Sequence, residues 1–504
     1  MNSKILSLNL LRKKLINNKK KKVLCHGVFD LIHLGHIRHL EAAKKRAEIL
    51  IVNLTPDKFI KKGPNRPYFT LEQRLESIAS LKCVDYVTWN NLESASDVIL
   101  NLKPNFYCKG QDYKKIKEDV TGKIKTEINA IKKVKGKIIF TDDIVFSSTQ
   151  LINDNFKLLN NDQQIIIERV KKKYSLKDLN TFFEKIKKLK VGVIGELIID
   201  IYAFGEALGK SGKEPIMMIK NINEEKYLGG TGAIANHLST FVQKIDLFAM
   251  IGEKKEYFNF IKNNLKKNIS SNFYLKNKSP TIIKKRYLDH VTNNKIIGFY
   301  TINDDSIEKK YEINLLNKIS KNLNKNKINI VSDYGHGMIT EKVKKIINSN
   351  RNFVAINTQV NAANTATFNL KKYHKVDLVM INEKELRNEL RNNSENINVL
   401  IRKLSNVIKS KYMVITRGTK GAIMYNFKKN KFFTCPAFAT KVLDRVGSGD
   451  SMLAILSVFL YLTKDEELSL LIGSIVAAEK VQNIGNKYIV EKKNILKILS
   501  HLLN

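Results

Sequence analysis

Residues 26–36 read His-Gly-Val-Phe-Asp-Leu-Ile-His-Leu-Gly-His, and this stretch decides how the first part of the chain folds. It follows a short apolar run that starts at Val23 and leads into an amphipathic stretch that reaches Ala47. This order predicts a strand, a turn and a helix. His33 and His36 lie three residues apart, so a helix places both imidazoles on one face.

The turn and the helix start suit a nucleoside triphosphate. Gly35 lets a ligand approach the backbone, and the helix N-terminus offers N–H donors and the positive end of the helix dipole. Two imidazoles can stabilise the charge that builds on the α-phosphate and the leaving pyrophosphate during in-line attack. Taken alone, the stretch also fits two structural histidines at the start of a helix.

The residues after this stretch alternate between strand-like and helix-like patterns. The expected elements are strands over 49–54, 86–88, 106–109 and 137–141, with helices over 71–81 and 95–102. Such alternation predicts a parallel sheet with right-handed crossovers. We therefore expect an α/β domain over residues 23–155, preceded by a basic segment over residues 1–22.

Residues 23–153 resemble the HxGH nucleotidylyltransferase superfamily, which includes cytidylyltransferases and the adenylyltransferase half of the bifunctional heptose kinase/adenylyltransferase. The likeness extends into five further segments, residues 63–67, 71–74, 83–87, 109–113 and 146–149. It implies a Rossmann-like domain that uses ATP or CTP. A class I aminoacyl-tRNA synthetase has a related motif, but it would also carry a lysine-rich KMSKS-type loop downstream, and the sequence shows none.

The resemblance also implies roles for individual residues. His33 and His36 are the expected catalytic pair, and Asp112 is expected on the acceptor side of the site. The residues expected to contact the nucleotide are Gly27, Phe29, Gly35, Lys109, Ser147, Ser148 and Thr149. Cys25 stands where such enzymes often have Thr, which leaves the main chemistry untouched.

A second stretch, residues 444–450, reads Asp-Arg-Val-Gly-Ser-Gly-Asp and is followed at once by an apolar helical run over residues 451–462. Small residues before a helix start form an anion-binding turn from backbone N–H groups. Asp450 at the end of the turn is placed to accept a proton from a hydroxyl that attacks the γ-phosphate of ATP. By itself the stretch also fits a glycine-containing loop in which Asp450 caps the helix.

This part of the chain resembles the ribokinase/PfkB family, whose motif reads DTxGAGD. Four more segments share the likeness: residues 195–200, 228–233, 382–385 and 416–421. The resemblance implies a ribokinase-like α/β sandwich over residues 188–504, with ATP as phosphoryl donor and Mg²⁺ as cofactor. Strands expected from the sequence itself cover residues 190–194, 328–332, 353–357, 378–382 and 413–416.

The kinase resemblance assigns further roles. Asp450 is the expected general base, Asn382 and Glu385 organise Mg²⁺ and phosphate through water, and no direct structural metal site is expected. The remaining expected contacts are Thr416, Gly418, Gly421, Gly447, Ser448 and Gly449 to the nucleotide, with Asp200, Gly229 and Gly230 to the sugar.

Several residues depart from the kinase pattern. Ala233 replaces the usual Asn, although Asn236 lies one helical turn on, and Arg445 and Ser448 replace Thr and Ala. His336 stands where heptose kinases tend to have Lys, and residues 357–361 replace a segment that commonly reads Asp-Pro-Lys. We expect these changes to surround the acceptor pocket and to leave the identity of the sugar open.

Composition limits the classes of partner. A chain of 504 residues with 43% hydrophobic residues can form two or three globular domains. The net charge of +40 would suit nucleic acid, but the lysines are spread along the whole chain, so we expect a solvated basic surface and no specific nucleic-acid partner. The four cysteines lie far apart without a CxxC pair, which favours a reducing compartment and argues against a zinc site.

Residues 1–22 lack a signal-peptide core, and the longest apolar run, residues 452–462, is too short to span a membrane. We therefore expect a cytoplasmic protein without membrane association. Residues 156–187 are polar, lysine-rich and helical in periodicity, and we expect them to form a connector between the two domains.

Together the two resemblances predict a bifunctional enzyme of nucleotide-sugar synthesis. One part would phosphorylate a sugar or sugar phosphate, such as a heptose, and the other would join AMP or CMP to a sugar 1-phosphate with release of pyrophosphate. The heptose enzyme has its kinase first in the chain, whereas here the order is reversed. The alternative is a nucleotidylyltransferase with a non-catalytic, sugar-binding kinase-like domain. The partners are sugar phosphates and nucleotides, with a homodimer as one candidate assembly.

Overall fold

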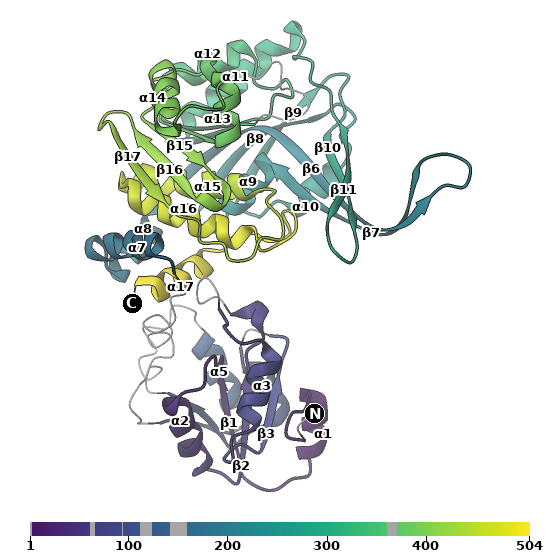
Figure 1. Cartoon of the computed structure of the whole chain (residues 1–504), viewed down its shortest axis with the longest axis vertical. Coiled ribbons are helices and arrows are strands. Elements are labelled where there is room, and N and C mark those ends of the chain that lie inside the picture. The colour runs from purple at the N-terminus through teal and green to yellow at the C-terminus, as the bar shows by residue number, and fades with distance from the viewer. Residues whose placement is uncertain are drawn as a thin grey trace. The chain divides into compact units, whose positions relative to one another are not determined.

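The computed structural model describes residues 3–60, 66–92, 94–110, 123–141, 159–359 and 370–503. The chain divides into two compact units: an N-terminal unit of residues 1–160 with 496–504, and a C-terminal unit of residues 161–495. Each unit contains a largely parallel sheet with helices, so the predicted α/β class is confirmed (Figure 1). No helix within the described ranges combines the length and apolar composition needed to cross a membrane.

The N-terminal unit contains a five-stranded sheet in which all neighbouring strands run parallel, in the order β3-β2-β1-β4-β5. Its strands are β1 (Lys22–Gly27), β2 (Ile49–Leu54), β3 (Tyr86–Trp89), β4 (Phe106–Lys109) and β5 (Lys137–Phe140). The chain runs outward from β1 to β3 and then returns to β4 beside β1. Ligands bind at such a switch point, outside the carboxyl ends of the strands.

The helices described around this sheet are α1 (Leu8–Leu15), α2 (Leu34–Lys44), α3 (Leu71–Ala79), α4 (Ser96–Leu102) and α5 (Lys123–Lys133). Successive residues of a strand point to opposite faces, so Val23 and Cys25 of β1 pack with α2 and α3, whereas Leu24 packs with α1, α4 and α5. The basic segment at the N-terminus therefore contains a helix that the sequence did not predict. Leu11 and Leu15 of α1 are buried in the core.

The C-terminal unit is organised around one long strand, β6 (Lys190–Lys210). The first part of β6 pairs with β8 and β12 in the main sheet. The main sheet comprises β8 (Lys244–Gly252), β9 (Ile269–Lys276), β12 (Ile328–Asp333), β13 (Phe353–Thr358), β14 (Leu378–Asn382), β15 (Tyr412–Thr416), β16 (Ala422–Asn426) and β17 (Lys431–Cys435). Among the described strands of this sheet, the antiparallel pairings are β15 with β16 and β16 with β17.

The second part of β6 belongs to a smaller sheet. It pairs with β7 (Met217–Gly230) and β10 (Ile282–Asp289), and β10 pairs in turn with β11 (Lys295–Thr301). The outer part of the β6–β7 hairpin extends away from the body of the unit (Figure 1). The sequence indicated only the first five residues of β6, because its pairing partners lie far away along the chain.

Helices cover both faces of the main sheet (Figure 1). One core combines α11 (Lys309–Lys325), α12 (Glu341–Ser349), α13 (Glu383–Leu390) and α14 (Ile397–Ile408) with β12 to β15. The other described helices of this unit are α7 (Asn161–Lys173), α8 (Leu176–Lys187), α9 (Thr231–Leu238), α10 (Phe258–Asn264), α15 (Ser448–Thr463) and α16 (Glu466–Lys480). The last helix, α17 (Lys492–Leu503), begins in this unit, but its residues from 496 onward belong to the N-terminal unit. Helix α15 contacts α8, α9, α16 and the central strands.

The segment expected as a connector forms α7 and α8, which pack within the C-terminal unit. Phe183 of α8 is fully buried, with its ring centroid 5.0 Å from that of Phe459 and 6.1 Å from that of Phe241. Gln163 of α7 donates a hydrogen bond of 2.6 Å to the Ala437 carbonyl. These two helices thus form part of the folded C-terminal unit.

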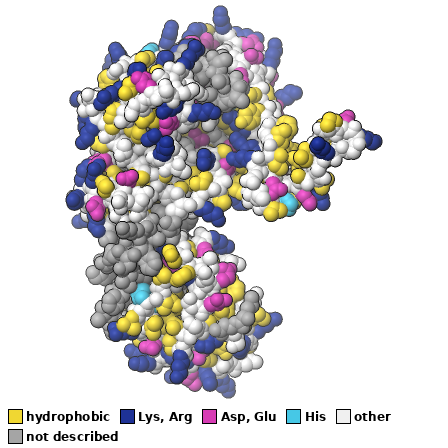
Figure 2. Space-filling view, viewed as in Figure 1, with side chains coloured by type: hydrophobic (Ala, Val, Ile, Leu, Met, Phe, Trp, Pro, Cys, Tyr) yellow, Lys and Arg dark blue, Asp and Glu magenta, His cyan; other side chains and the backbone are white. Residues whose placement is uncertain are grey.

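Lysine and arginine side chains are scattered over the visible face of both units (Figure 2). They do not gather over one element in this view, and acidic and hydrophobic side chains lie among them. This distribution agrees with a solvated basic surface.

Candidate active sites

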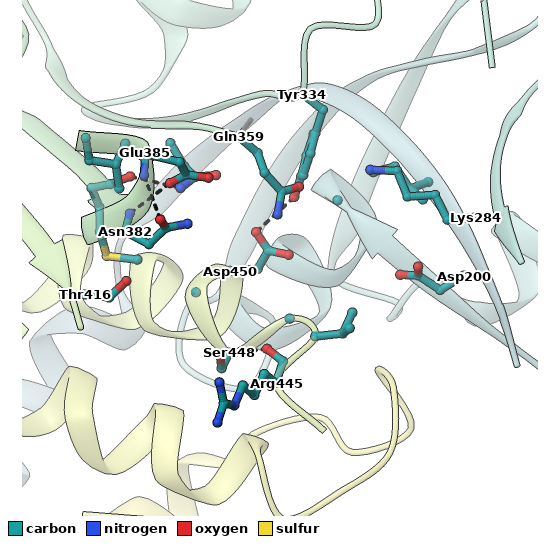
Figure 3. A pocket seen from close by; sticks show the side chains of 18 of the residues that line it. Asp200, Lys284, Tyr334, Gln359, Asn382, Glu385, Thr416, Arg445, Ser448 and Asp450 are labelled. Atoms are coloured by element: carbon teal, nitrogen blue, oxygen red, sulfur yellow. Dashed lines mark hydrogen bonds between the residues drawn. The ribbon is translucent and has the colours of Figure 1, made fainter. Parts of the chain in front are cut away.

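The C-terminal unit contains a cavity of about 560 Å³ at the carboxyl ends of the central strands (Figure 3). Its walls come from the main sheet, the small sheet and the first turn of α15. The residues that line the cavity include Asp200, Gly230, Lys284, Arg286, Tyr300, Tyr334, Asn382, Glu385, Thr416, Gly447, Ser448, Gly449 and Asp450. Residues from all five predicted kinase motifs therefore meet around one space.

The turn before α15 presents its backbone to this cavity. Gly447 has a φ of +77° and is the N-cap residue, and a Cβ there would lie 2.3 Å from Oδ1 of Asn486. A Cβ at Gly449, by contrast, would meet nothing within 4 Å. The first turn of a helix has N–H groups without acceptors inside the helix, so Gly449 and Asp450 can offer theirs to an anion.

Asp444, the first residue of the same motif, holds this turn in place. Its buried carboxylate accepts hydrogen bonds from the Val446 and Gly485 amides at 3.1 and 2.9 Å. It also accepts from the Tyr202 hydroxyl at 2.8 Å and from Lys295 Nζ at 2.6 Å. The start of the motif is thus structural, whereas its end faces the cavity.

Asp450 does not act as the helix cap, because the N-cap of α15 is Gly447. The Tyr334 hydroxyl donates a hydrogen bond of 2.9 Å to Oδ1 of Asp450 (Figure 3). Burial, and after it the charge of Asp200, raises the pKa of Asp450 to about 6, while the bond from Tyr334 acts in the opposite direction. A carboxylate with such a pKa is ionised at neutral pH and more basic than an exposed aspartate, as a general base requires.

Asp200 lies on the other side of the cavity, in the second part of β6. Arg286 Nη1 donates a hydrogen bond of 2.6 Å to Oδ1 of Asp200. A Cβ at Gly229 would lie 2.2 Å from Oδ2 of the same carboxylate, so glycine is required for Asp200 to lie over the turn. Gly230, with a φ of +55°, lines the cavity itself.

Two cations of β10 were missed by the sequence reasoning. Lys284 is buried, and its Nζ lies 5.5 Å and 5.4 Å from the ring centroids of Tyr300 and Tyr334. Burial lowers the pKa of Lys284. Lys284 and Arg286 alternate along the strand and so share one face, a pattern visible in the sequence. Their place over the cavity depends on the pairing of β10 with β6.

Asn382 and Glu385 form a reciprocal cap at the start of α13. Asn382 Oδ1 accepts from the Glu385 amide at 2.9 Å, and Glu385 Oε2 accepts from the Asn382 amide at 2.8 Å (Figure 3). Both residues also line the cavity, as does Thr416 at the end of β15. Gly418 and Gly421 have positive φ angles in the turn that follows and are not among the lining residues.

Two of the departures from the kinase pattern, Ala233 and His336, lie outside the cavity lining, so the expectation that all of them surround the acceptor is wrong for these two. Asn236, one helical turn after Ala233, does not line the cavity either. Asn236 donates to the Asn264 carbonyl at 2.9 Å and accepts from the Lys266 amide at 3.2 Å. His336 is fully buried, with Nδ1 2.6 Å from Oδ1 of Asp304. The departures that line the cavity are Asn357, Gln359, Arg445 and Ser448.

The candidate site of the N-terminal unit lies at the turn between β1 and α2. His33 is the N-cap of α2, and its Nδ1 accepts a hydrogen bond of 3.1 Å from the Gly35 amide. The rings of His33 and His36 stack with centroids 4.0 Å apart, and the Phe29 ring lies edge-on to His36 at 5.3 Å. Burial lowers the pKa of His33, which favours the neutral imidazole. Gly27 ends β1 beside this turn.

Other side chains hold the turn rigid. Arg74 of α3 is almost fully buried and donates to the carbonyls of Val28 at 2.6 Å and Thr55 at 3.0 Å. Asp30 is buried and accepts from the Tyr68 amide at 2.8 Å. These contacts fix the backbone on which the two histidines stand.

Lys109 ends β4, next to β1 at the switch point. It is buried, and its Nζ lies 3.2 Å from Oε2 of Glu127 and 5.3 Å from the ring centroid of Tyr107. Four other predicted site residues lie outside the described residues: Asp112, Ser147, Ser148 and Thr149.

Comparison with known proteins assigns both parts of the chain. Residues 188–493 match the pfkB family carbohydrate kinase model. The chain belongs to the pfkB family of carbohydrate kinases. Residues 24–188 match the cytidylyltransferase-like model. The chain therefore combines a pfkB kinase domain with a cytidylyltransferase-like domain, as the two resemblances predicted.

Curated relatives share parts of this combination. The bifunctional protein HldE of Campylobacter curvus (strain 525.92) is 26% identical over 306 residues, which cover 60% of this chain and 63% of that protein. HldE of Helicobacter acinonychis (strain Sheeba) is 43% identical over 112 residues, which cover 22% of this chain and 24% of that protein. The chain thus spans less than two thirds of the length of these relatives.

Solved structures support the fold of the pfkB part. Phosphofructokinase-2 from Escherichia coli in complex with potassium matches with a TM-score of 0.51 at 14% identity, over 62% of this chain and 99% of that one. Ribokinase from Thermotoga maritima matches with a TM-score of 0.50 at 19% identity, over the same shares of the two chains. The ribokinase-like fold predicted for this part is confirmed.

Proposed function

We propose that this pfkB-family protein is a bifunctional enzyme of nucleotide-sugar synthesis. The C-terminal unit phosphorylates a sugar phosphate with ATP, and the N-terminal unit transfers a nucleotidyl group to a sugar 1-phosphate with release of pyrophosphate. The observation that carries the proposal is the position of Asp450. Its carboxylate faces the cavity from the anion-binding turn of α15, with a pKa raised to about 6.

In the kinase step, Asp450 accepts the proton of the substrate hydroxyl while that oxygen attacks the γ-phosphorus of ATP. The bond from the γ-phosphorus to the bridging oxygen breaks, and ADP leaves with the electron pair. The backbone N–H groups of Gly449 and Asp450, in the first turn of α15, donate to the charge that develops on the transferred phosphoryl group. This role uses the N–H groups at the N-terminus of α15 that have no acceptor within the helix.

The nucleotide lies along the other end of the cavity in this proposal. Thr416 borders it, and Gly418 and Gly421 shape the adjoining turn. A bound Mg²⁺ would supply positive charge to offset that of the ATP phosphates. Glu385 is a carboxylate in the cavity lining and Asn382 orients it, so these two residues suit a hydrated Mg²⁺ that is held through water.

The acceptor lies between Asp200 and β10. Asp200 accepts hydrogen bonds from sugar hydroxyls above Gly229 and Gly230. Lys284 and Arg286 place two cationic groups in the same lining, and one carboxylate, Asp200, already pairs with Arg286. A second anionic group on the substrate complements this charge, which favours a sugar phosphate over a free sugar. A heptose phosphate is the first substrate to test, because of the resemblance to heptose kinases.

In the transferase step, the phosphate oxygen of a sugar 1-phosphate attacks the α-phosphorus of ATP or CTP, and pyrophosphate leaves. The nucleophile is already an anion, so the step needs charge stabilisation and no base. We assign that role to His33 and His36, with Gly27, Phe29, Gly35 and Lys109 around the nucleotide. ATP is the first nucleotide to test.

A substrate panel tests the whole proposal. Purified full-length protein is incubated with sugar phosphates and sugar 1-phosphates, each with ATP or CTP, and ADP and pyrophosphate are quantified separately. The proposal requires sugar-dependent ADP formation with at least one sugar phosphate and pyrophosphate release with at least one sugar 1-phosphate. Pyrophosphate release without any sugar-dependent ADP formation would show that the kinase-like part is a non-catalytic module.

A further inference from the structure

Three side chains that the proposed function does not use meet beneath the turn between β1 and α2. Cys25 of β1 and Cys108 of β4 are directly paired in the register of the two parallel strands. Both belong to the core on the face of the sheet that α2 covers. His39 comes from α2, three residues after His36. One ligand atom from each of these three residues lies within 4.8 Å of the other two.

These distances are close to those of a metal site. Tetrahedral zinc holds thiolate sulfur at about 2.3 Å and imidazole nitrogen at about 2.0–2.1 Å, which places the ligand atoms roughly 3.5–3.8 Å from one another. Side-chain rotations that shorten the separations by about 1 Å bring the three atoms onto one ion. No change in strand pairing is needed, because the two cysteines already stand side by side.

The donor types also select the ion. Thiolates favour zinc and other soft ions over Mg²⁺. Cys25 and Cys108 are fully buried, and two thiolates neutralise a divalent cation, so the assembled site adds no net charge to the interior. His39 Nδ1 lies 2.8 Å from the Thr141 hydroxyl, a contact of the kind that orients a ligating imidazole.

We propose that Cys25, Cys108 and His39 form a zinc site that ties α2 to the central strands of the N-terminal unit. The three side chains supply three of the four ligands of a tetrahedral zinc ion. His39 belongs to α2, which has His33 as its N-cap and carries His36. A metal ion that holds His39 therefore fixes the helix start that presents both imidazoles. The inference concerns metal binding alone and does not rest on either proposed activity.

The sequence argued against zinc because the cysteines are far apart and no CxxC pair exists. Cysteines that are distant along the chain nevertheless come together here, because β1 and β4 are adjacent strands. Cys83 provides an internal control, because it lies in the same unit and is partly exposed, but does not belong to the three-residue group.

The test uses full-length protein in four forms: the parent, Cys108→Ala, His39→Gln and the control Cys83→Ala. Each is stripped with a chelator, titrated with Co²⁺ as a spectroscopic substitute for zinc, and then titrated with Zn²⁺ in competition. Circular dichroism establishes that each form is folded. The parent and Cys83→Ala should bind one equivalent of Co²⁺ with thiolate-to-cobalt charge-transfer absorption.

The charge-transfer absorption should be lost in Cys108→Ala, and Zn²⁺ affinity in His39→Gln should fall at least tenfold. Equal Co²⁺ spectra in the parent and Cys108→Ala would overturn the proposal. Failure of the parent protein to bind Co²⁺ under reducing conditions would also overturn it. The same conclusion holds if mass spectrometry finds a Cys25–Cys108 disulfide before reduction and the reduced protein still binds no Co²⁺. None of these readouts depends on turnover, so the outcome is separate from that of the substrate panel.

Discussion

The N-termini of α2 and α15 are both candidate phosphate-binding sites, but they carry different side chains: imidazoles at α2 and a carboxylate at α15. Each follows a turn at the carboxyl edge of a parallel sheet, and each can offer N–H groups to phosphate. At α2 the polar side chains are stacked imidazoles, and burial lowers the pKa of His33. At α15 the side chain is a carboxylate, and burial raises the pKa of Asp450 to about 6.

The difference follows from the nucleophile that each unit is proposed to use. A sugar phosphate that attacks the α-phosphorus is already anionic, so neutral or cationic donors are what the transferase needs. A sugar hydroxyl that attacks the γ-phosphorus must lose a proton, so the kinase needs a base. Burial favours the uncharged form of the side chain at both sites. At α2 it favours a neutral imidazole that can donate a hydrogen bond, and at α15 it makes the Asp450 carboxylate a stronger base.

The largest expected effect comes from Asp450→Asn. Asparagine keeps the size of the side chain but cannot accept the hydroxyl proton, so sugar-dependent ADP formation should fall by about 10²- to 10⁴-fold. ATP affinity should stay near the parent value, as measured by equilibrium binding. An unchanged kinase rate would show that Asp450 is not the general base. It would also favour the alternative in which the C-terminal unit is a non-catalytic sugar-binding module.

His36→Ala should lower pyrophosphate release by roughly 10²- to 10³-fold, as expected for loss of one donor to the charge of the transition state. The measurement is single-turnover pyrophosphate release with the sugar 1-phosphate that the parent accepts. A change confined to KM, with kcat intact, would contradict the catalytic role and leave His36 as a binding residue.

Lys284→Ala should reduce kcat/KM for a sugar phosphate by about 10- to 10²-fold, because a hydrogen bond to a charged group contributes about 1.5–3 kcal/mol. The matched control is the same variant assayed with the corresponding free sugar, for which the loss should be much smaller. Equal losses of kcat/KM for both substrates would mean that Lys284 shapes the cavity but does not contact the phosphate of the substrate.

Tyr334→Phe should change the pH dependence more than the maximal rate. With the parent, kcat of the kinase should fall below pH about 6, where Asp450 becomes protonated. The Tyr334 hydroxyl lowers the pKa of Asp450, so its removal raises that pKa and moves the acid limb toward higher pH. A limb that stays in place or moves toward lower pH would contradict this assignment of the base.

The sequence could predict the residues whose motif is local. Asp450 follows its own glycine turn, and His33 and His36 stand at one short helix start, so local motifs located both candidate sites and the family resemblances supplied the expected roles. Strands β1 to β5, the first part of β6 and β12 to β15 were also predictable from short, mainly apolar runs, whereas β8, β9, β16 and β17 were not predicted. What stayed hidden depends on pairing between distant segments.

Lys284 and Arg286 enter the cavity only because β10 pairs with the second part of β6. Cys25 meets Cys108 only through the register of β1 with β4. Asp444 opens the 444–450 motif, and its four hydrogen bonds with residues distant or near in the sequence give it a structural role. Spacing along the chain does not contain these contacts.

The most direct test of the two-site account measures ADP formation and pyrophosphate release side by side in the parent, Asp450→Asn and His36→Ala. The account predicts opposite selectivity: Asp450→Asn loses sugar-dependent ADP formation and keeps pyrophosphate release, while His36→Ala loses pyrophosphate release and keeps ADP formation. If either substitution abolished both activities in protein that circular dichroism shows to be folded, the two sites would not be independent and the account would be wrong.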